Sequence, residues 1–182
     1  MPTLSNRAIQ IHEKLLEVFG EPIWRNPLPP VDELVSTILS QNTNDNNRDK
    51  AFNALRAKFA TWEAVRDANV SEVVAAIRPA GLANQKGPRI QQVLRQITEE
   101  RGSLDLSFLA DLPLEEARDW LMKFNGVGPK TAAIVLCFSL GRPAFPVDTH
   151  IYRVSGRIGL RPEKMTVEQA HKKQKKLFPP ET

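Results

Sequence analysis

The stretch that decides the fold lies in the second half of the chain and reads Leu121-Met-Lys-Phe-Asn-Gly-Val-Gly-Pro-Lys-Thr-Ala-Ala-Ile-Val-Leu136. It predicts a helix, a tight glycine turn and a second helix. Gly126 and Gly128 allow backbone angles that other residues resist, and Pro129 suits the first position of a helix because its missing N–H costs nothing there. The apolar residues that follow predict that the second helix is largely buried. The turn stays exposed, and its N–H groups form a site for an anion such as phosphate.

Apolar residues at helical spacing recur along the rest of the chain. We find no run of period-2 alternation, so we expect an all-α protein of about ten helices. The helices expected before the quoted stretch cover residues 5–19, 31–41, about 46–59, 61–67, 71–77, about 89–100 and 114–124, with a turn at 81–88. The expected caps are Asp45 or Asn46, Thr61, Ser71, and Asp148 or Thr149, and residues 166–169 form a capping box.

Composition narrows the function without defining it. The 182 residues carry 25 Lys and Arg against 21 Asp and Glu, a net charge of +4 that permits an anionic partner but does not demand one. A single cysteine, Cys137, excludes a disulfide within the chain and a cysteine-only metal site. No apolar run approaches the roughly 20 residues of a membrane span, and the first residues lack the pattern of a signal peptide. We therefore expect an intracellular protein.

Two charged residues could carry chemistry. Lys130 stands beside the glycine turn, and Asp148 follows eighteen residues later. A lysine amine can attack an aldehyde-like carbon and form a Schiff base, and a nearby carboxylate can orient or deprotonate the nucleophile or stabilise a developing positive charge. The spacing is equally compatible with a solvated surface lysine and a helix-capping aspartate.

Two segments taken together resemble the endonuclease III family of DNA repair glycosylases. They are Phe124-Asn-Gly-Val-Gly-Pro-Lys-Thr-Ala132, which matches the family's helix-hairpin-helix, and Phe145-Pro-Val-Asp-Thr-His-Ile-Tyr-Arg-Val154. Three further segments match in the same order: Leu39-Ser-Gln-Asn-Thr-Asn-Asp45, Gly81-Leu-Ala-Asn-Gln-Lys-Gly-Pro-Arg-Ile90 and Leu112-Pro. The resemblance spans about residues 30 to 160, and it departs from the family where Phe124-Asn125 replaces the usual Leu-Pro.

The resemblance implies a bifunctional DNA glycosylase/AP lyase that removes oxidised pyrimidines and cuts the abasic strand by β-elimination. Lys130 matches the family's Schiff-base lysine, and Asp148 matches its catalytic aspartate. The damaged base would be flipped out of the duplex into a cleft between two helical subdomains. We expect residues 23–133 to form a six-helix barrel-like subdomain that includes the hairpin, and residues 1–22 plus 134–182 to form the second.

The resemblance also implies a set of DNA contacts. Gln41 and Asn42 match the polar wedge that fills the gap left by the flipped base, although the sequence leaves open which of them does so, and the run could simply end a helix. Lys86 and Arg89 open a helix and could contact phosphate or be surface charge. The hairpin N–H groups would hold phosphates. The residues expected at DNA are Gln41, Asn42, Lys86, Gly126, Val127, Gly128, Thr131 and His150. The basic run from Lys172 to Lys176 is interpreted mainly as a solvated helix face.

Cofactors are constrained by what the chain lacks. Most members of the family carry four cysteines after the last helix that bind a [4Fe-4S] cluster, and this chain has none there. We therefore expect no cluster, in either a shortened chain or a naturally cluster-free variant. A monovalent cation bound by main-chain carbonyls at residues 125–128 is also implied. No other metal site is expected, because His12, His150 and His171 lack ligand spacing.

The expected partner is double-stranded DNA with damaged or abasic sites, bound by a monomer without a membrane, in the cytoplasm and nucleoid of a prokaryote. Two alternatives stay open at this point. One is a helix-hairpin-helix module that binds DNA without catalysis. The other is a glycosylase for T·G or U·G mismatches, which the lysine at position 130 disfavours.

Overall fold

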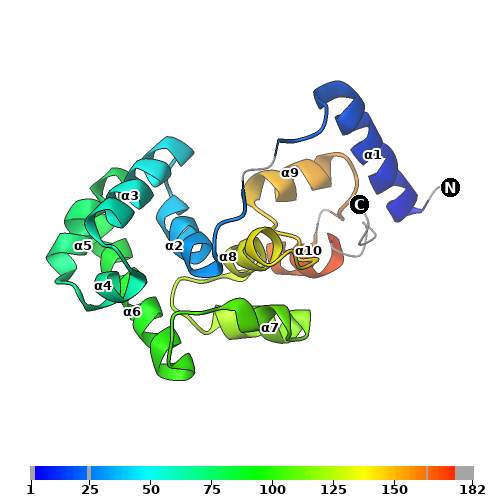
Figure 1. Ribbon diagram of the computed structural model, residues 1–182. Coiled ribbons are helices and arrows are strands. Elements are labelled where there is room, and N and C mark those ends of the chain that lie inside the picture. Colours follow the sequence, from blue (N-terminus) through cyan, green and yellow to red (C-terminus); the bar gives the residue numbers. More distant parts are fainter. Residues whose placement is uncertain (1–2, 24–25, 163, 175–182) are drawn as a thin grey trace.

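The computed structural model describes residues 3–23, 26–162 and 164–174 (Figure 1). The described residues contain helices and no strand, which confirms the all-α prediction. The α-helices are α1 (Leu4–Phe19), α2 (Pro30–Ser40), α3 (Asp45–Lys58), α4 (Trp62–Asp67), α5 (Val70–Ala76), α6 (Ala83–Arg101), α7 (Leu114–Met122), α8 (Pro129–Ile134), α9 (Thr149–Arg157) and α10 (Val167–Gln174). Two 3-10 turns, η1 (Arg78–Ala80) and η2 (Ser107–Ala110), and a π-helical segment, η3 (Val135–Ser139), complete the described part.

The helices form two groups with α8 between them. Figure 1 shows α2 to α6 gathered on one side, α7 and α8 in the middle, and α9, α10 and the N-terminal α1 on the other. The first and last parts of the described chain therefore lie in the same group. The division into residues 23–133 and 1–22 plus 134–182 remains a prediction. The buried cluster of the first group continues past residue 133 to Val135 and Leu136.

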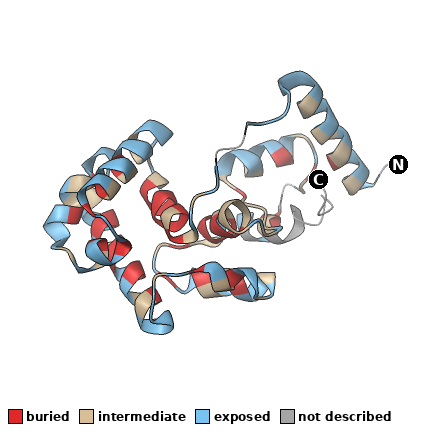
Figure 2. Cartoon of the chain, in the orientation of Figure 1, coloured by how far each residue is buried: buried red, intermediate tan, exposed pale blue. Residues whose placement is uncertain are grey.

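A large hydrophobic core holds the first group and α8 together. It draws on α2 to α8 and η3, and its residues face inward from helices whose outer faces are exposed (Figure 2). Leu34, Ile38, Leu94 and Leu121 are among its fully buried members. Burying side chains of this size contributes roughly 1.5–3 kcal/mol each relative to leaving them exposed, so this cluster is the main source of stability for α8.

A second, smaller cluster lies under α9 and α10. It consists of Val147, Met165 and Ala170, with Phe145 and Tyr152 packed against it. The hydroxyl of Tyr152 donates a hydrogen bond to the carbonyl of Met165. This cluster anchors the loop that leads into α9.

Several helix ends confirm the sequence predictions. Thr61 caps α4, Asp148 caps α9, and Pro129 is the first residue of α8. The capping box is formed in full, because Thr166 Oγ1 accepts from the Gln169 N–H (3.2 Å) and Gln169 Oε1 accepts from the Thr166 N–H (3.1 Å). The basic run from Lys172 to Lys176 stays a prediction. The side chains of Lys172 and Lys173, and all of residues 175–182, lie outside the described part.

Two predicted caps are wrong. Asn44, and neither Asp45 nor Asn46, caps α3 by accepting from the Asn47 N–H at 2.9 Å. Asn69 replaces Ser71 as the cap of α5. Asn and Asp are equally good caps, so a run that contains several of them does not define which one is used.

The turn predicted at residues 81–88 is also wrong beyond its first two residues. Helix α6 begins at Ala83 and contains Pro88, after Leu82 in a left-handed conformation (φ +50°). Tertiary contacts favour this early start. A Cβ on Gly87 would lie 2.8 Å from Val74 Cγ2, so α5 and α6 pack closely at that point.

Candidate active site

The glycine hairpin joins α7 to α8 and is built on buried apolar residues. Phe124 and Val127 are buried, and the Val127 N–H donates to the Phe124 carbonyl at 3.0 Å. Gly126 has φ +82°, a conformation that disfavours any side chain. Gly128 precedes Pro129 as the N-cap of α8. Residues 114–134 therefore form the helix, glycine hairpin and second helix predicted from the sequence.

Lys130 and Asp148 face each other across the two helix starts. The ammonium nitrogen of Lys130 lies 3.9 Å from Oδ2 of Asp148, and the two side chains are 51% and 29% exposed. The other carboxylate oxygen of Asp148, Oδ1, accepts from the Ile151 N–H at 2.7 Å and caps α9. One oxygen thus fixes the carboxylate to its helix while the other faces the amine, so the capping interpretation and the pairing with Lys130 both hold.

The loop before Asp148 is held from α10. Nδ1 of His171 lies 3.2 Å from the Phe145 carbonyl oxygen and 3.4 Å from the Val147 nitrogen. Burial lowers the pKa of the His171 imidazole, and its backbone hydrogen bonds only partly offset that effect. The neutral ring is therefore the favoured form in this position.

Gln41 and Asn42 differ sharply in their surroundings. The Gln41 side chain donates from Nε2 to the Gly126 carbonyl at 2.9 Å and accepts at Oε1 from Arg89 Nη1 at 3.2 Å. Asn42 is exposed and has a left-handed backbone (φ +53°), which Asn tolerates better than most residues. The structure thus brings Gln41 to the hairpin and leaves the Asn42 side chain at the surface. The tie through Arg89 had no signal in the sequence.

Lys86 does not occupy the position expected of a phosphate contact. Its side chain is only 1% exposed, and its ammonium donates to the carbonyls of Leu39 (2.7 Å) and Ala80 (2.8 Å). Burial lowers its pKa, and the charge of Arg89 adds to that effect. The predicted role of Lys86 at DNA is therefore corrected to an internal one.

The other residues predicted to contact DNA differ in how far they are exposed. The side chains of Val127 and Thr131 are buried, and the Val127 N–H is used within the hairpin, so neither side chain reaches the surface. His150 is exposed and accepts at Nδ1 from Arg153 at 3.2 Å. Gly126 and Gly128 are half-buried in the hairpin, and their role at DNA stays a prediction.

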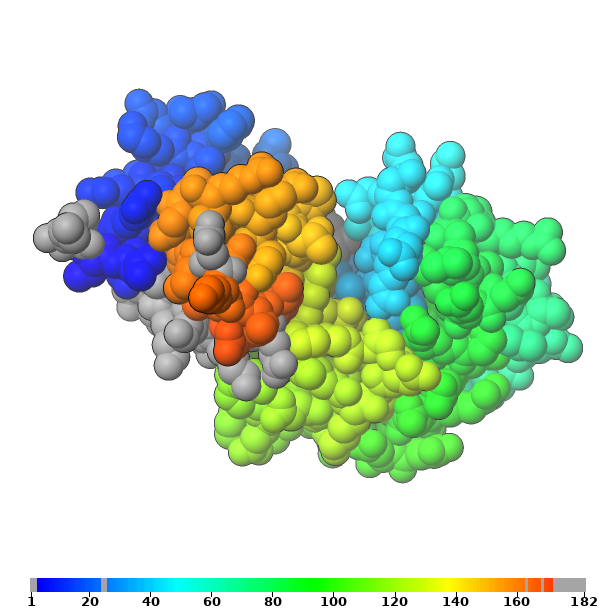
Figure 3. Space-filling view, turned by 180° about the vertical axis from the view of Figure 1, so that it is seen from behind, coloured from blue at the N-terminus to red at the C-terminus, as the bar shows by residue number. Residues whose placement is uncertain are grey.

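A polar recess opens one helical turn from Lys130. It has a volume of about 330 Å³ and lies where α2 and the start of α3 meet α8 and η3. Ile134, four residues after Lys130 and on the same face of the helix, forms part of its wall. The other lining residues are Glu33, Ser36, Thr37, Ser40, Asp45, Arg48 and Phe138. Viewed from behind, the surface is notched between the α9 segment and the α2–α3 segment (Figure 3). No pattern in the sequence marks this recess.

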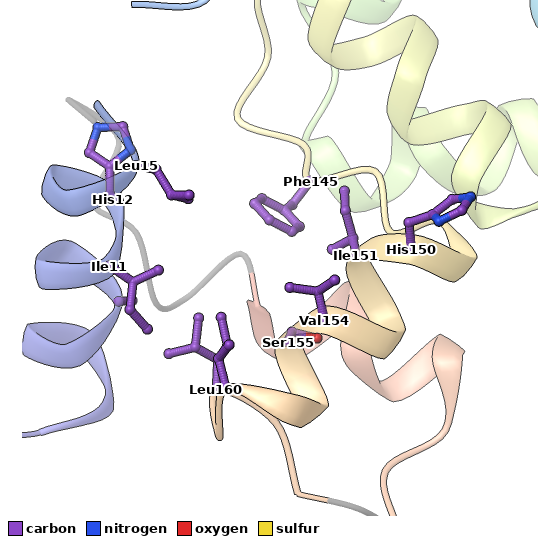
Figure 4. A pocket seen from close by; sticks show the side chains of 11 residues that line it. Ile11, His12, Leu15, Phe145, His150, Ile151, Val154, Ser155 and Leu160 are labelled. Carbon is purple, nitrogen blue, oxygen red and sulfur yellow. The ribbon is translucent and has the colours of Figure 1, made fainter. Parts of the chain in front are cut away.

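A second cavity, of about 320 Å³, differs in character. It is an apolar groove between α1 and α9, in which Ile11 and Leu15 face Ile151, Val154 and Leu160 (Figure 4). Neither Lys130 nor Asp148 lines it. The polar side chains in its wall are those of His12, His150 and Ser155, and the Ser155 hydroxyl donates a hydrogen bond to the Tyr152 carbonyl.

The residues present do not fit the iron-sulfur cluster of the endonuclease III family. The chain has one cysteine, Cys137, and a cluster needs four thiolates. Within the described ranges, no three His, Cys, Asp or Glu side chains gather to hold a metal ion. The monovalent cation at residues 125–128 stays a prediction. The Gly126 carbonyl accepts a hydrogen bond from Gln41, and the Gly128 carbonyl accepts one from the Ala132 N–H. No helix among the described residues is long and apolar enough to cross a bilayer.

Comparison with known proteins identifies the chain as a member of a class of DNA repair proteins. The family model described as HhH-GPD superfamily base excision DNA repair protein matches residues 35–180. The chain belongs to this superfamily.

Individual relatives share part of their length with the chain. A putative DNA glycosylase of Arabidopsis thaliana is 41% identical over 133 residues, which make up 73% of this chain and 45% of that protein. Endonuclease III of Thermotoga maritima is 34% identical over 150 residues, 82% of this chain and 66% of that protein. The chain thus spans less than two thirds of both relatives. One is a plant protein, so these matches do not support a prokaryotic source.

The fold is similar to that of endonuclease III itself. A solved structure of a trapped endonuclease III–DNA covalent intermediate matches with a TM-score of 0.79 and 28% sequence identity, covering 100% of this chain and 81% of that chain. This agreement confirms the predicted endonuclease III-like fold for the part of the chain that the structure describes.

Proposed function

We propose that this protein is a DNA glycosylase with AP lyase activity that excises oxidised pyrimidines. The observation that carries the proposal is the approach of Lys130 Nζ to within 3.9 Å of Asp148 Oδ2 at the exposed start of two helices. A half-exposed amine beside a carboxylate is what Schiff-base chemistry requires. The covalent intermediate trapped in the endonuclease III structure supports the same chemistry.

The reaction begins when the unprotonated amine of Lys130 attacks C1′ of the damaged nucleotide. The C1′–N bond breaks, and the base leaves with its bonding electrons and takes up a proton. Asp148 Oδ2 accepts a proton from the attacking nitrogen and stabilises positive charge at the sugar. Opening of the sugar ring then gives the Schiff base between Lys130 and C1′.

Strand cleavage follows from the same intermediate. Loss of a proton from C2′ sends electrons into the imine and expels the 3′ phosphate by breaking the C3′–O bond. Water then hydrolyses the Schiff base and releases Lys130 as the free amine. Asp148 is within reach to move protons at the nitrogen, while its second oxygen holds the carboxylate to α9.

The flipped base would enter the polar recess beside α8. The wall contributed by Ile134 begins one turn from Lys130, and its volume of about 330 Å³ accommodates a pyrimidine. Phe138 contributes an aromatic ring to the wall, and the polar side chains of Ser36, Ser40 and Arg48 in the same wall would contact a polar, oxidised ring. Asn42 would fill the gap left in the duplex, because it is exposed whereas Gln41 is tied to the hairpin. The N–H groups of Gly126 and Gly128 would hold backbone phosphate.

Borohydride trapping on a duplex with one abasic site tests the proposal. Wild-type protein should form a covalent adduct that Lys130→Gln abolishes. The matched control is Lys123→Gln, which removes a 60% exposed lysine from the other end of the same hairpin and should leave trapping intact. Folded wild-type protein that binds the duplex and yields no adduct would support the non-catalytic module instead.

A panel of duplexes that differ only in the damaged base identifies which base the protein excises. Excision should be seen with thymine glycol or 5-hydroxypyrimidines. Excision confined to T·G and U·G mismatches would favour the mismatch glycosylase.

A further inference from the structure

Three residues from distant parts of the chain connect the wedge loop (residues 40–43) to the glycine hairpin. Gln41 lies 85 positions from Gly126 in the sequence, yet its side-chain amide donates to the Gly126 carbonyl at 2.9 Å. Arg89, from α6, donates to the same amide at 3.2 Å. We call this chain of contacts, Arg89–Gln41–Gly126, the strut.

The strut has a single consistent hydrogen-bond arrangement. An arginine side chain can only donate, and a main-chain carbonyl can only accept. The Gln41 amide must therefore direct its oxygen to Arg89 and its nitrogen to Gly126, as observed. Both ends of this half-buried side chain are used, so it cannot rotate without breaking a bond.

Gly126 is shaped to receive the strut. A Cβ at this position would lie 2.5 Å from Arg89 Cδ and 2.7 Å from Arg89 Nε. The absence of a side chain thus serves two needs, the positive φ of the turn and the passage of Arg89 across it. Any other residue would push Arg89 away from Gln41.

Helix α6 also holds the base of the wedge loop. Lys86, three residues before Arg89, donates to the Leu39 carbonyl at the end of α2. Residues three apart share a helix face, so α6 fixes both Leu39 and Gln41. The residue that follows, Asn42, is exposed in its left-handed conformation, and Lys130 lies four residues beyond Gly126.

From this geometry we infer that Gln41 is a positioning residue, which fixes the spacing between the wedge at Asn42 and the hairpin that carries Lys130. The inference rests on the proposed function. The strut fixes the distance between Asn42, which would fill the gap in the duplex, and Lys130, which would attack the sugar of the flipped nucleotide. Breaking it should impair the step that takes a nucleotide out of the stack and spare the reaction of Lys130 with a sugar already outside it.

The test compares two abasic substrates of the same sequence. In one, the abasic nucleotide lies opposite adenine; in the other, it forms a one-nucleotide bulge that is already extrahelical. Gln41→Leu keeps the size of the side chain and removes both hydrogen bonds. We expect single-turnover cleavage of the paired substrate to fall about tenfold, as the loss of two ordinary hydrogen bonds implies, and cleavage of the bulge to fall less than about threefold. Gln92→Leu, the same change at an exposed position of α6, should alter neither.

A second variant and a second readout separate positioning from a merely structural role. Gln41→Glu still accepts from Arg89 but cannot donate to Gly126, so it should behave like Gln41→Leu. With 2-aminopurine opposite the abasic site, wild-type binding should raise fluorescence as the wedge unstacks the base, and both variants should lose that rise.

Equal losses on the two substrates, a wild-type rate for Gln41→Glu, or an unchanged fluorescence rise would each overturn the inference. Failure of the proposed function would look different. In that case wild-type protein itself would give no Lys130-dependent adduct on either substrate.

Discussion

Lys130 and Asp148, the two members of the candidate active site, are held in place by packing of very different extent. Lys130 belongs to α8, whose neighbours in sequence and space are part of a core that runs from α2 to η3. Asp148 belongs to the start of α9, where Val147, Met165 and Ala170 make up the buried cluster in the described part of the chain. The proposed nucleophile is thus held by dense packing, whereas the Asp148 carboxylate is held by its own cap hydrogen bond and a few contacts.

This difference separates two kinds of perturbation. A change in the large core should weaken the whole molecule together with the position of Lys130. A change in the small cluster should move Asp148 and leave most of the fold in place. Perturbing the Asp148 carboxylate, the large core, the small cluster and His171 in turn tests that distinction.

The largest expected effect comes from removing the charge of Asp148 while keeping its cap. In Asp148→Asn the side-chain oxygen can still accept from the Ile151 N–H, so thermal stability should change little. The rate of strand cleavage should fall by about 10²–10⁴, the usual contribution of a proton-transfer group. Asp148→Ala should show the same loss of rate and, in addition, about 1 kcal/mol less stability from the lost cap. Asp148→Asn with a wild-type rate would refute the catalytic role of the carboxylate.

Cavity formation in the large core comes next. Leu121 is fully buried, and Leu121→Ala should lower the free energy of unfolding by about 2–5 kcal/mol. Met122→Ala, at a neighbouring side chain that is 36% exposed, should cost far less. Denaturant unfolding monitored by tryptophan fluorescence measures both. Equal stability of the two variants would show that the large core is not the source of rigidity for the hairpin.

A smaller, local effect is expected from the second cluster. Val147 is 1% exposed, and Val147→Ala should cost about 1–2 kcal/mol from the lost apolar burial. Hydrogen exchange should increase in α9 and much less in α2 and α6, and cleavage should slow severalfold because Asp148 loses its support. The matched control is Val154→Ala, since that side chain is 47% exposed on α9, the helix that Val147 precedes. Uniform exchange across both groups would mean that the two clusters open as one unit.

The smallest effect concerns pH. Since burial lowers the pKa of His171 in the folded protein, the unfolded chain takes up its proton first, near its ordinary pKa of about 6.5. The free energy of unfolding should therefore fall as the pH drops from about 6.5 towards the lower pKa of the folded state. Above about 6.5 the contribution of His171 should be fully present. His171→Asn should flatten this slope in melting temperatures measured between pH 5.5 and 7.5. A slope that is the same in the variant would assign the pH dependence to other groups.

The sequence predicted the helices and the pairing at the site for identifiable reasons. Periodic apolar residues mark helices, and Gly126, Pro129 and Asp148 have local roles that depend on their own backbone. The approach of Asp148 to Lys130 did not follow from spacing alone, because the two helices are joined by an irregular loop. It was expected only through the resemblance to the endonuclease III family.

The features of the site that the sequence did not indicate depend on contacts between residues far apart in the chain. Lys86 looks like a surface charge at the start of a helix, and its burial becomes clear only when the carbonyls of Leu39 and Ala80 are in place. The different surroundings of Gln41 and Asn42 likewise depend on Arg89 and Gly126. The recess beside α8 gathers residues from three helices and a π-helical segment, so it has no local signal.

The central claim is that Lys130 itself forms the covalent bond to DNA. Peptide mapping by mass spectrometry of the borohydride-trapped adduct tests it most directly, with wild-type protein and with Asp148→Asn. We expect the sugar remnant on Lys130 in both proteins, formed more slowly in Asp148→Asn. A remnant on the N-terminal amine or on any other lysine would contradict it.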